Sequence, residues 1–208
     1  MLSNVSVSNF IKQLASEAPT PGGGGVSALV GALSAALSSM MANLTLGKEK
    51  YKNVEQKMSL WQGELAVAQS EFLKLIDDDA AAYNAIIKCY AMPKKTEEEK
   101  ILRKEKLAKA AQTAALVPLK ICENAVKVLK ITENVASLGN PMLLTDAGCA
   151  AILGIATLEC GKLNVKINLP LTHNDEFITS CENKLQQYEK NATLSKEIIL
   201  KIVQKEFA

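Results

Sequence analysis

The sequence predicts an all-α fold, a single-domain bundle of long antiparallel helices that takes in residues 1–208. Two observations carry this prediction. Apolar residues make up 48% of the chain but aromatic residues only 4%, so Ala, Leu, Val, Ile and Met must build the core, which favours helix over sheet. Apolar side chains also recur at intervals of three and four residues, the periodicity of packed helices. With 208 residues, the chain can bury such a core in one domain.

The first half of the chain is expected to hold three helices. Residues 3–17 form a short amphipathic helix, with Phe10, Ile11 and Leu14 on one side. Residues 18–25 form a turn, because two prolines and four glycines cannot continue a helix. A buried helix follows over about 26–46 and ends at Gly47, and a longer helix then runs over about 50–91.

Two of these helices have distinct packing faces. In the buried helix, small residues fall on one stripe and would let a neighbouring helix approach closely: Gly31, Ala35, Ser38 and Ala42. In the long helix, a bundle seam follows 4-3-4-3-4 spacing: Phe72, Ile76, Asp79, Tyr83, Ile86 and Tyr90. Both patterns predict helices that pack along most of their length.

The second half of the chain is expected to be helical as well. Thr96 and Glu99 form a capping box that predicts a helix over about 96–135, and Pro118 inside it should bend the helix and free the carbonyl of Ala114. A turn at 139–141 leads into a small-residue helix that reaches about residue 160. Residues 161–170 alternate apolar and polar, which predicts an extended link or a short strand before a last helix from about 174.

Charge and cysteine usage narrow the class of protein. The 24 basic and 22 acidic residues give a net charge of +2, and arginine is nearly absent, so nucleic acid is not expected as a partner. The five cysteines lie far apart and form no CxxC pair, which fits reduced thiols in a cytoplasmic protein. Residues 18–47 carry no charge, but their serines suit the central helix of a bundle better than a membrane span.

The glycines ahead of the buried helix are a candidate anion site. Glycines there expose backbone N–H groups at the positive end of a helix, and Ser27 adds a hydroxyl in the first turn. The run matches neither the dinucleotide-binding fingerprint nor the phosphate loop. We expect Gly22, Gly23, Gly24 and Ser27 to contact a ligand, with a plain connector as the alternative.

Asp79 is the strongest candidate for acid–base chemistry. It occupies a seam position, where burial would raise the pKa of its carboxyl unless a partner compensates. A structural hydrogen bond to a neighbouring helix is the alternative role. Asp77 and Asp78 point away from the seam and are expected in solvent. Asp146, the second candidate, follows Thr145 at a helix start, where either residue could instead be an N-cap.

Three further polar residues could bind a substrate. Lys48 follows the buried helix and could meet an anion. Asn164 and Asn168 would project to one side of the extended segment, which would suit amide recognition of a polar heterocycle. His173 is the only histidine and lies in a polar turn, so no His-based metal site is expected.

Several short segments, taken in order, resemble one family. They are residues 20–24, 26–29, 43–48, Asp77, Asp79, 93–94, 117–119, Gly139, Asn140, Asp146, 164–165 and 167–169. This ordered set is similar to the cyclodeaminase/cyclohydrolase family of tetrahydrofolate one-carbon enzymes, over nearly the whole chain. Gly25 departs from the pattern, because many relatives have Ser there.

The resemblance implies an all-helical homodimer that binds a tetrahydrofolate derivative near the subunit interface, with no metal and no redox cofactor. It implies that 5-formimidoyltetrahydrofolate is cyclised to 5,10-methenyltetrahydrofolate with release of ammonia. The alternatives are a 5,10-methenyltetrahydrofolate cyclohydrolase and, from another class, a non-catalytic folate-binding or interaction dimer.

Residue chemistry then suggests a role for each matched position. We expect Asp79 to act as the acid and base, with Asp146 second. The glycine turn and Lys48 would hold the substrate carboxylates. Asn164 and Asn168 would meet the pterin, and Asn140 would also contact the substrate.

Overall fold

A computed structural model describes residues 1–206, and every regular element among them is helical. The α-helices are α1 (Val7–Leu14), α2 (Gly23–Asn43), α3 (Glu55–Tyr90), α4 (Glu97–Leu138), α5 (Leu144–Asn168) and α6 (Asp175–Glu206). Short 3₁₀ helices lie at Leu2–Asn4, Glu49–Val54, Pro141–Leu143 and Leu169–Thr172. The predicted all-α, single-domain bundle is confirmed for the described residues.

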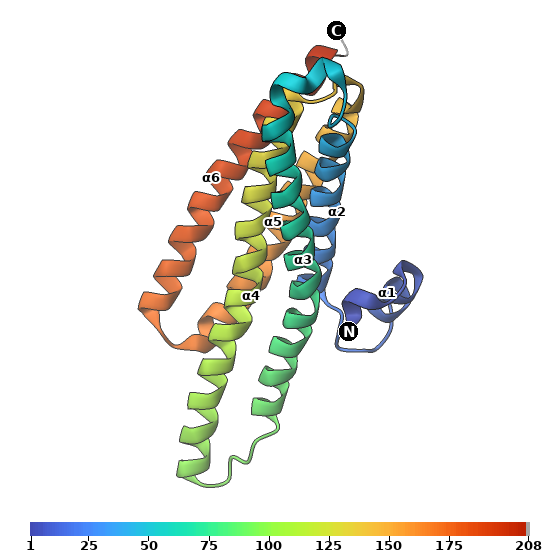
Figure 1. The fold of residues 1–208 in the computed structure, drawn as a ribbon. Coiled ribbons are helices and arrows are strands. Elements are labelled where there is room, and N and C mark those ends of the chain that lie inside the picture. Colours follow the sequence, from blue (N-terminus) through green and yellow to red (C-terminus); the bar gives the residue numbers. More distant parts are fainter. Residues whose placement is uncertain (207–208) are drawn as a thin grey trace.

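The helices α2 and α5 lie side by side and run antiparallel, with α3, α4 and α6 packed around them (Figure 1). Two hydroxyls on α2 cross to α5: Ser27 Oγ donates to the Thr157 carbonyl at 2.8 Å, and Ser34 Oγ donates to the Ala150 carbonyl at 2.7 Å. These bonds satisfy two buried serines, so a helix without charges can also hold polar groups in the core.

Small side chains bring the helices close, as the stripe on α2 predicted. Gly31 faces Phe72 of α3, and a Cβ added at Gly31 would meet the Phe72 ring at 2.5 Å. On the α4 side, Ser38 and Thr132 share a hydrogen bond of 2.6 Å between their hydroxyls. Larger residues at these positions would push the bundle apart.

The ends of α3 and α4 continue past the other helices as a projecting hairpin, seen at the lower end of Figure 1. We call residues 82–114 the arm. A small separate core of Ala82, Ile86 and Ala114 holds its base together. The projection explains why Phe72 and Ile76 of the predicted seam are buried, whereas Tyr83 and Tyr90 are 40% and 46% exposed.

The prediction of an extended link over 161–170 is wrong. The helix α5 continues through this segment to Asn168, and a 3₁₀ turn over Leu169–Thr172 follows. The alternation of Val165 and Ile167 misled the prediction, because Val165 is buried in the bundle while Ile167 is 72% exposed. Tertiary packing of one side of the helix decides this segment, and local pattern does not.

The interruption predicted at Pro118 has a partner in the fold. Pro118 lies inside the continuous helix α4 and has no N–H to donate to the Ala114 carbonyl. That carbonyl instead accepts a hydrogen bond of 3.1 Å from Nδ2 of Asn168 on α5. The bond ties the end of α5 to the base of the arm.

Helix boundaries follow the expected chemistry at some ends and not at others. The capping box of Thr96 and Glu99 is present at the start of α4, and Gly47 has a φ of +72° after α2. The first helix is shorter than predicted: Ser6 caps α1, and of its three expected packing residues only Phe10 is buried, while Ile11 and Leu14 are exposed.

Two segments have the length and apolar composition of a membrane-spanning helix, Gly23–Asn43 and Pro141–Thr172, each with a mean hydropathy of 1.6. They correspond to α2 and to α5 with its flanking turns, the two helices that the rest of the bundle packs against. Core helices of bundles meet the same test by composition alone.

Candidate functional site

A pocket of about 310 Å³ lies where the start of α2 meets α3, α4 and the end of α5. Its volume falls at the low end of the range for small-molecule sites. Six of the residues predicted to act on a substrate line it: Gly22, Gly23, Gly24, Asp79, Asn164 and Asn168. Residues from four separate segments therefore meet at one place, which their sequence positions alone did not show.

Asp79 is the one ionisable group with a perturbed pKa among the described residues that line this pocket. Burial raises the pKa of its carboxyl above the ordinary value, and a hydrogen bond from the Gly25 backbone N–H offsets part of the rise. The carboxyl is therefore poised to hold and release a proton closer to neutral pH than a solvated aspartate.

The glycines allow the start of α2 to approach this carboxyl. The helix begins at Gly23, three residues earlier than predicted, with Gly22 as its N-cap. Glycine suits this place because a Cβ at Gly24 would overlap the Asp79 carboxylate, whereas the backbone alone fits. Within the described chain, no side chain caps this helix start, so its first N–H groups face the pocket and Asp79.

The two asparagines line the pocket from one face of α5. They lie four residues apart on the helix, so they share a side for a helical reason and not because of an extended strand. Asn164 Nδ2 donates to the Cys160 carbonyl at 2.8 Å, and Asn168 Nδ2 donates to the carbonyls of Ala114 and Asn164. Their Nδ2 groups are therefore occupied, and their side-chain oxygens remain as acceptors for a ligand.

Sequence reasoning did not assign several other lining residues to the site. Thr20 precedes the glycines, and Tyr83 lies one turn after Asp79 on α3. Apolar side chains complete the walls: Ile86, Ile167 and Leu171. Tyr83 could have been found, because it follows Asp79 in the same seam and its partial exposure marks the place where the bundle opens.

Three predicted residues lie at the other end of the bundle. Lys48 is exposed beyond the C-terminal end of α2, and Asn140 caps the 3₁₀ turn before α5. Asp146 lies in the first turn of α5 and is not its N-cap, a position that Leu143 holds. At 1.5 Å per residue, the 18 residues from Asp146 to Asn164 span about 27 Å. Within one chain, these three residues do not reach the pocket around Asp79.

Two further predicted positions have structural partners. Ser27 is buried, and its hydroxyl donates to the Thr157 carbonyl instead of facing the pocket. Asp77 was expected in solvent, but it accepts hydrogen bonds from the Leu2 N–H at 2.6 Å and the Ser3 hydroxyl at 2.5 Å. Asp78 fits the expectation, because it pairs with Lys74 on the exposed side of α3.

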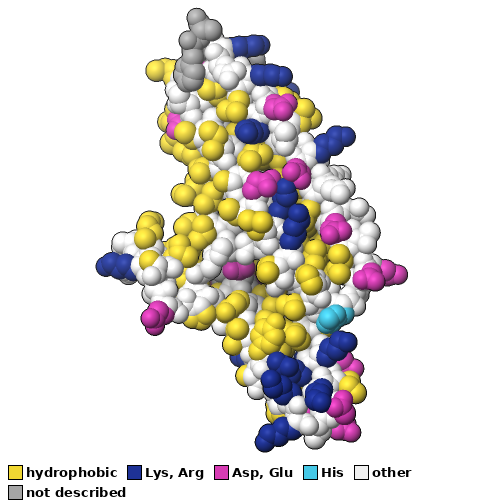
Figure 2. All heavy atoms as spheres, turned by 180° about the vertical axis from the view of Figure 1, so that it is seen from behind, with side chains coloured by type: hydrophobic (Ala, Val, Ile, Leu, Met, Phe, Trp, Pro, Cys, Tyr) yellow, Lys and Arg dark blue, Asp and Glu magenta, His cyan; other side chains and the backbone are white. Residues whose placement is uncertain are grey.

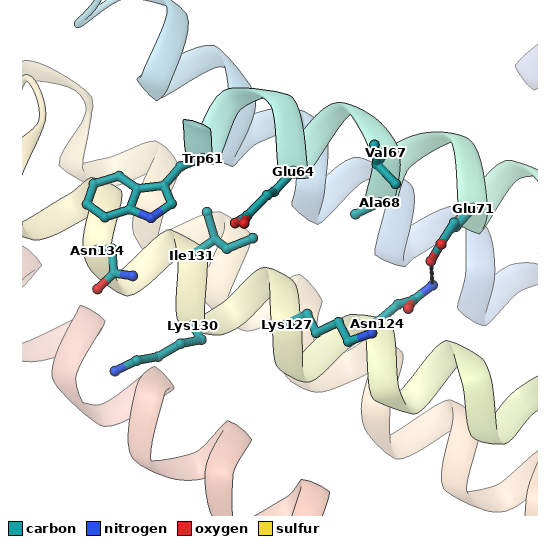
Figure 3. A pocket seen from close by; sticks show the side chains of 10 residues that line it. All are labelled: Trp61, Glu64, Val67, Ala68, Glu71, Asn124, Lys127, Lys130, Ile131 and Asn134. Carbon is teal, nitrogen blue, oxygen red and sulfur yellow. Dashed lines mark hydrogen bonds between the residues drawn. The ribbon is translucent and has the colours of Figure 1, made fainter. Parts of the chain in front are cut away.

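A second hollow of about 530 Å³ lies between α3 and α4 (Figure 3). Trp61 lies at one end of it, and at the other Asn124 Nδ2 donates to Glu71 Oε2 at 2.8 Å. The Asn124 side-chain oxygen is buried and has no partner among the described residues. No residue predicted to act on a substrate lines this hollow, so the pocket around Asp79 remains the candidate site.

The pocket around Asp79 offers groups for acid–base chemistry on a small planar molecule. Asp79 can transfer a proton, the first N–H groups of α2 can donate to an oxygen, and apolar walls can exclude water from a ring. Among residues 1–206, no group of three or more His, Cys, Asp or Glu is placed to hold a metal ion.

Comparison with known proteins gives a consistent result. The family model described as formiminotransferase-cyclodeaminase matches residues 6–187. The chain is 40% identical over 189 residues to a methenyltetrahydrofolate cyclohydrolase from Methylorubrum extorquens, covering 91% of this chain and 89% of that protein. It is 29% identical over 203 residues to the formimidoyltransferase-cyclodeaminase of Mus musculus, covering 96% of this chain but only 37% of that longer protein.

A solved structure agrees over the full length. The crystal structure of formiminotetrahydrofolate cyclodeaminase from Thermotoga maritima matches with a TM-score of 0.90 at 28% identity, covering 100% of both chains.

Proposed function

Because this chain belongs to the formiminotransferase-cyclodeaminase family, we propose that it is an enzyme of folate one-carbon chemistry whose active site is the pocket around Asp79. The observation that carries the proposal is a partly buried carboxyl with a raised pKa in a cavity lined by glycine backbone. A purely structural aspartate would be paired and would have no cavity beside it, so this arrangement argues against a non-catalytic role.

The first candidate reaction is hydrolysis of 5,10-methenyltetrahydrofolate, because the relative with 40% identity is named for it. Water adds to the methenyl carbon while the Asp79 carboxylate takes one of its protons. The bond from that carbon to N5 then breaks, N5 takes up the proton, and 10-formyltetrahydrofolate results. One carboxyl that changes protonation can serve both steps.

The second candidate is the cyclodeaminase reaction, which the matching Thermotoga maritima structure favours by its name. N10 of 5-formimidoyltetrahydrofolate attacks the amidine carbon and loses its proton, and the amidine nitrogen leaves as ammonia after it has been protonated. Asp79 would accept the first proton and return it to the leaving nitrogen. The same carboxyl and the same cationic ring are needed in both reactions.

The pocket can hold the ring system that these reactions share. The side-chain oxygen of Asn164 lies beside Gly23 and can accept from the N–H edge of a pterin. Tyr83 and Ile86 can cover the faces of the ring. We propose that the reaction needs neither a metal nor a redox cofactor and that the protein works in the cytoplasm.

We also propose that the chain forms a homodimer through an apolar face of α2 and α5. The face consists of six exposed side chains, 37% to 72% exposed: Leu33, Met40, Leu44, Ile152, Leu163 and Ile167. All 21 residues of α2 are uncharged, which leaves no polar rim on this helix to keep the face in water. Since Ile167 also lines the pocket, the proposed interface lies next to the site.

One pair of assays tests the proposed function. The protein is given 5,10-methenyltetrahydrofolate and 5-formimidoyltetrahydrofolate separately, while methenyl absorbance and ammonia are followed. Loss of methenyl absorbance identifies the cyclohydrolase, and a gain of absorbance with ammonia identifies the cyclodeaminase. The Asp79→Asn variant should lose activity by about 100- to 10,000-fold.

The neighbouring Asp78→Asn variant is the matched control, because Asp78 lies outside the pocket and pairs only with Lys74 among the described residues. Asp78→Asn should keep its activity. Turnover of neither substrate by the wild-type protein would refute the proposed function, and full turnover by Asp79→Asn would refute the role of Asp79.

A further inference from the structure

The pocket around Asp79 lacks a positive group for one end of the proposed substrate. Among the described residues that line it, there is no lysine, arginine or histidine. A tetrahydrofolate carries a glutamyl tail with carboxylates at the end opposite its ring. If the ring binds beside Asp79, the tail leaves the pocket and needs a cationic partner outside it.

The arm is the nearest strongly basic part of the molecule. Residues 88–109 contain eight lysines or arginines against four glutamates. Figure 2 shows Lys and Arg side chains gathered over the lower end of the molecule, the end that the arm forms. Ala82, Ile86 and Ala114 of the arm line the pocket, so the basic segment begins at the mouth of the pocket.

Helical phase identifies which of these cations face the open side of the pocket. Residues 18 apart on an α-helix are separated by five full turns and share a direction. Lys100 shares its direction with Pro118, and Lys104 with Cys122, and a Cβ at Gly161 of α5 would contact atoms of both Pro118 and Cys122. Because α5 ends at Asn168, the side of the arm that carries Lys100 and Lys104 extends past it without cover.

Other lysines of the arm point elsewhere. Lys106 shares its direction with Asn124, which faces Glu71 of α3 on the side of the second hollow. Lys109 lies five residues before Ala114, about 140° from it around the helix, and is exposed. These two lysines have the same charge and similar exposure as Lys100 and Lys104 but lie away from the pocket.

Arg103 fixes the arm between the two facing lysines. Its Nε donates to the Cys89 carbonyl at 3.1 Å, one of its terminal nitrogens donates to the Tyr90 carbonyl at 3.3 Å, and its guanidinium lies 5.7 Å from the Tyr90 ring centre. Arg103 therefore joins α4 to the end of α3. Lys104 has no ion-pair partner among the described residues, and Lys100 has only the exposed Glu97 at 2.6 Å.

We propose that Lys100 and Lys104 bind the glutamyl carboxylates of the substrate, so that the arm is the tail-binding half of the active site. By helix rise, Lys104 lies about 15 Å and Lys100 about 21 Å from Ala114 at the pocket wall. A tail with several γ-linked glutamates can reach both. The inference rests on the proposed function, because it takes the ring of a folate to lie beside Asp79.

The test compares K100Q/K104Q with the control K106Q/K109Q, which removes the same charge from the other sides of the arm. Each is given 5,10-methenyltetrahydrofolate with three glutamates and the analogue that lacks glutamate. For K100Q/K104Q, KM for the triglutamate should rise about tenfold at low salt, with kcat unchanged. Its KM for the analogue without glutamate should not change, and the control should match the wild type with both compounds.

Equal KM values for K100Q/K104Q and the wild type, or the same rise with both compounds or in both variants, would overturn the proposal. Equilibrium binding of the two compounds is measured in parallel and separates the two claims. If the wild-type protein binds the triglutamate through Lys100 and Lys104 but turns over nothing, the proposed function fails and the tail site stands. If turnover is normal and the affinities do not differ, the tail site alone fails.

Discussion

At the scale of single residues, Asp79 and Gly24 depend on each other. Burial raises the pKa of the Asp79 carboxyl, and the start of α2 can lie against that carboxyl only because Gly24 has no side chain. The sequence predicted Asp79 from its place in an apolar seam and the glycines from their place before a helix. It could not show that the two touch, because 55 residues separate them.

The raised pKa of Asp79 predicts how stability depends on pH. The folded state binds this proton more tightly than the unfolded chain, so the stabilising contribution is complete below the ordinary value of 3.8 and is lost as pH rises through the raised pKa. Asp79→Asn does not titrate. Relative to the wild type, it should therefore be more stable at pH 7 than at pH 3.5, as measured by urea unfolding. A difference that is the same at both pH values would contradict this.

Gly24→Ala should displace the Asp79 carboxylate, because the added methyl would overlap it. A shift of about 1 Å in a reacting group lowers rates by about 100-fold, so kcat should fall by about that factor. Gly63→Ala on the exposed side of α3 is the control, since a Cβ there meets nothing within 4 Å. That variant should keep its activity and gain up to about 1 kcal/mol in free energy of unfolding.

At the scale of helices, local signals set some boundaries and distant contacts set others. The capping box at Thr96 and the glycine after α2 were readable because the chemistry lies within a few residues. The course of α5 through Asn168 was not readable. It depends on Val165 packing into the core and on Asn168 reaching a carbonyl that Pro118 has freed on another helix.

A double-mutant cycle tests this contact between α4 and α5. Asn168→Ala leaves the Ala114 carbonyl without its donor and should lower the free energy of unfolding by about 1–3 kcal/mol. Pro118→Ala supplies an N–H to the same carbonyl from within α4. In that background, Asn168→Ala should be less destabilising by about 1 kcal/mol, measured by urea unfolding. Additive effects would show that the two residues do not share the carbonyl.

At the scale of the whole molecule, the predicted site residues separate into two groups at opposite ends of the bundle. Gly22, Gly23, Gly24, Asp79 and the two asparagines meet in one pocket, while Lys48, Asn140 and Asp146 lie far from it. The order of segments along a chain does not reveal which ends of long helices meet. Only the path of α2 and α5, each more than 20 residues long, decides which group a residue joins.

The apolar face of α2 and α5 predicts the state of assembly. The wild-type protein should be a dimer in sedimentation equilibrium at micromolar concentration. A lysine in the centre of the face, as in Leu33→Lys or Ile152→Lys, should give a folded monomer, because burying an unpaired charge opposes association. Leu194→Lys on α6 replaces a leucine of similar exposure away from this face and should stay dimeric. A monomeric wild type would refute the interface.

The raised pKa of Asp79 also makes the pocket a store for a proton that a cationic ligand would displace. A methenyl ring carries a positive charge, so its binding beside the carboxyl would lower the pKa of Asp79 and release part of a proton into the buffer. Calorimetric titration of the ring in two buffers with different ionisation enthalpies should then give different heats. Asp79→Asn should give the same heat in both buffers. The pocket would thus report the charge of its ligand as a change in bound hydrogen ions.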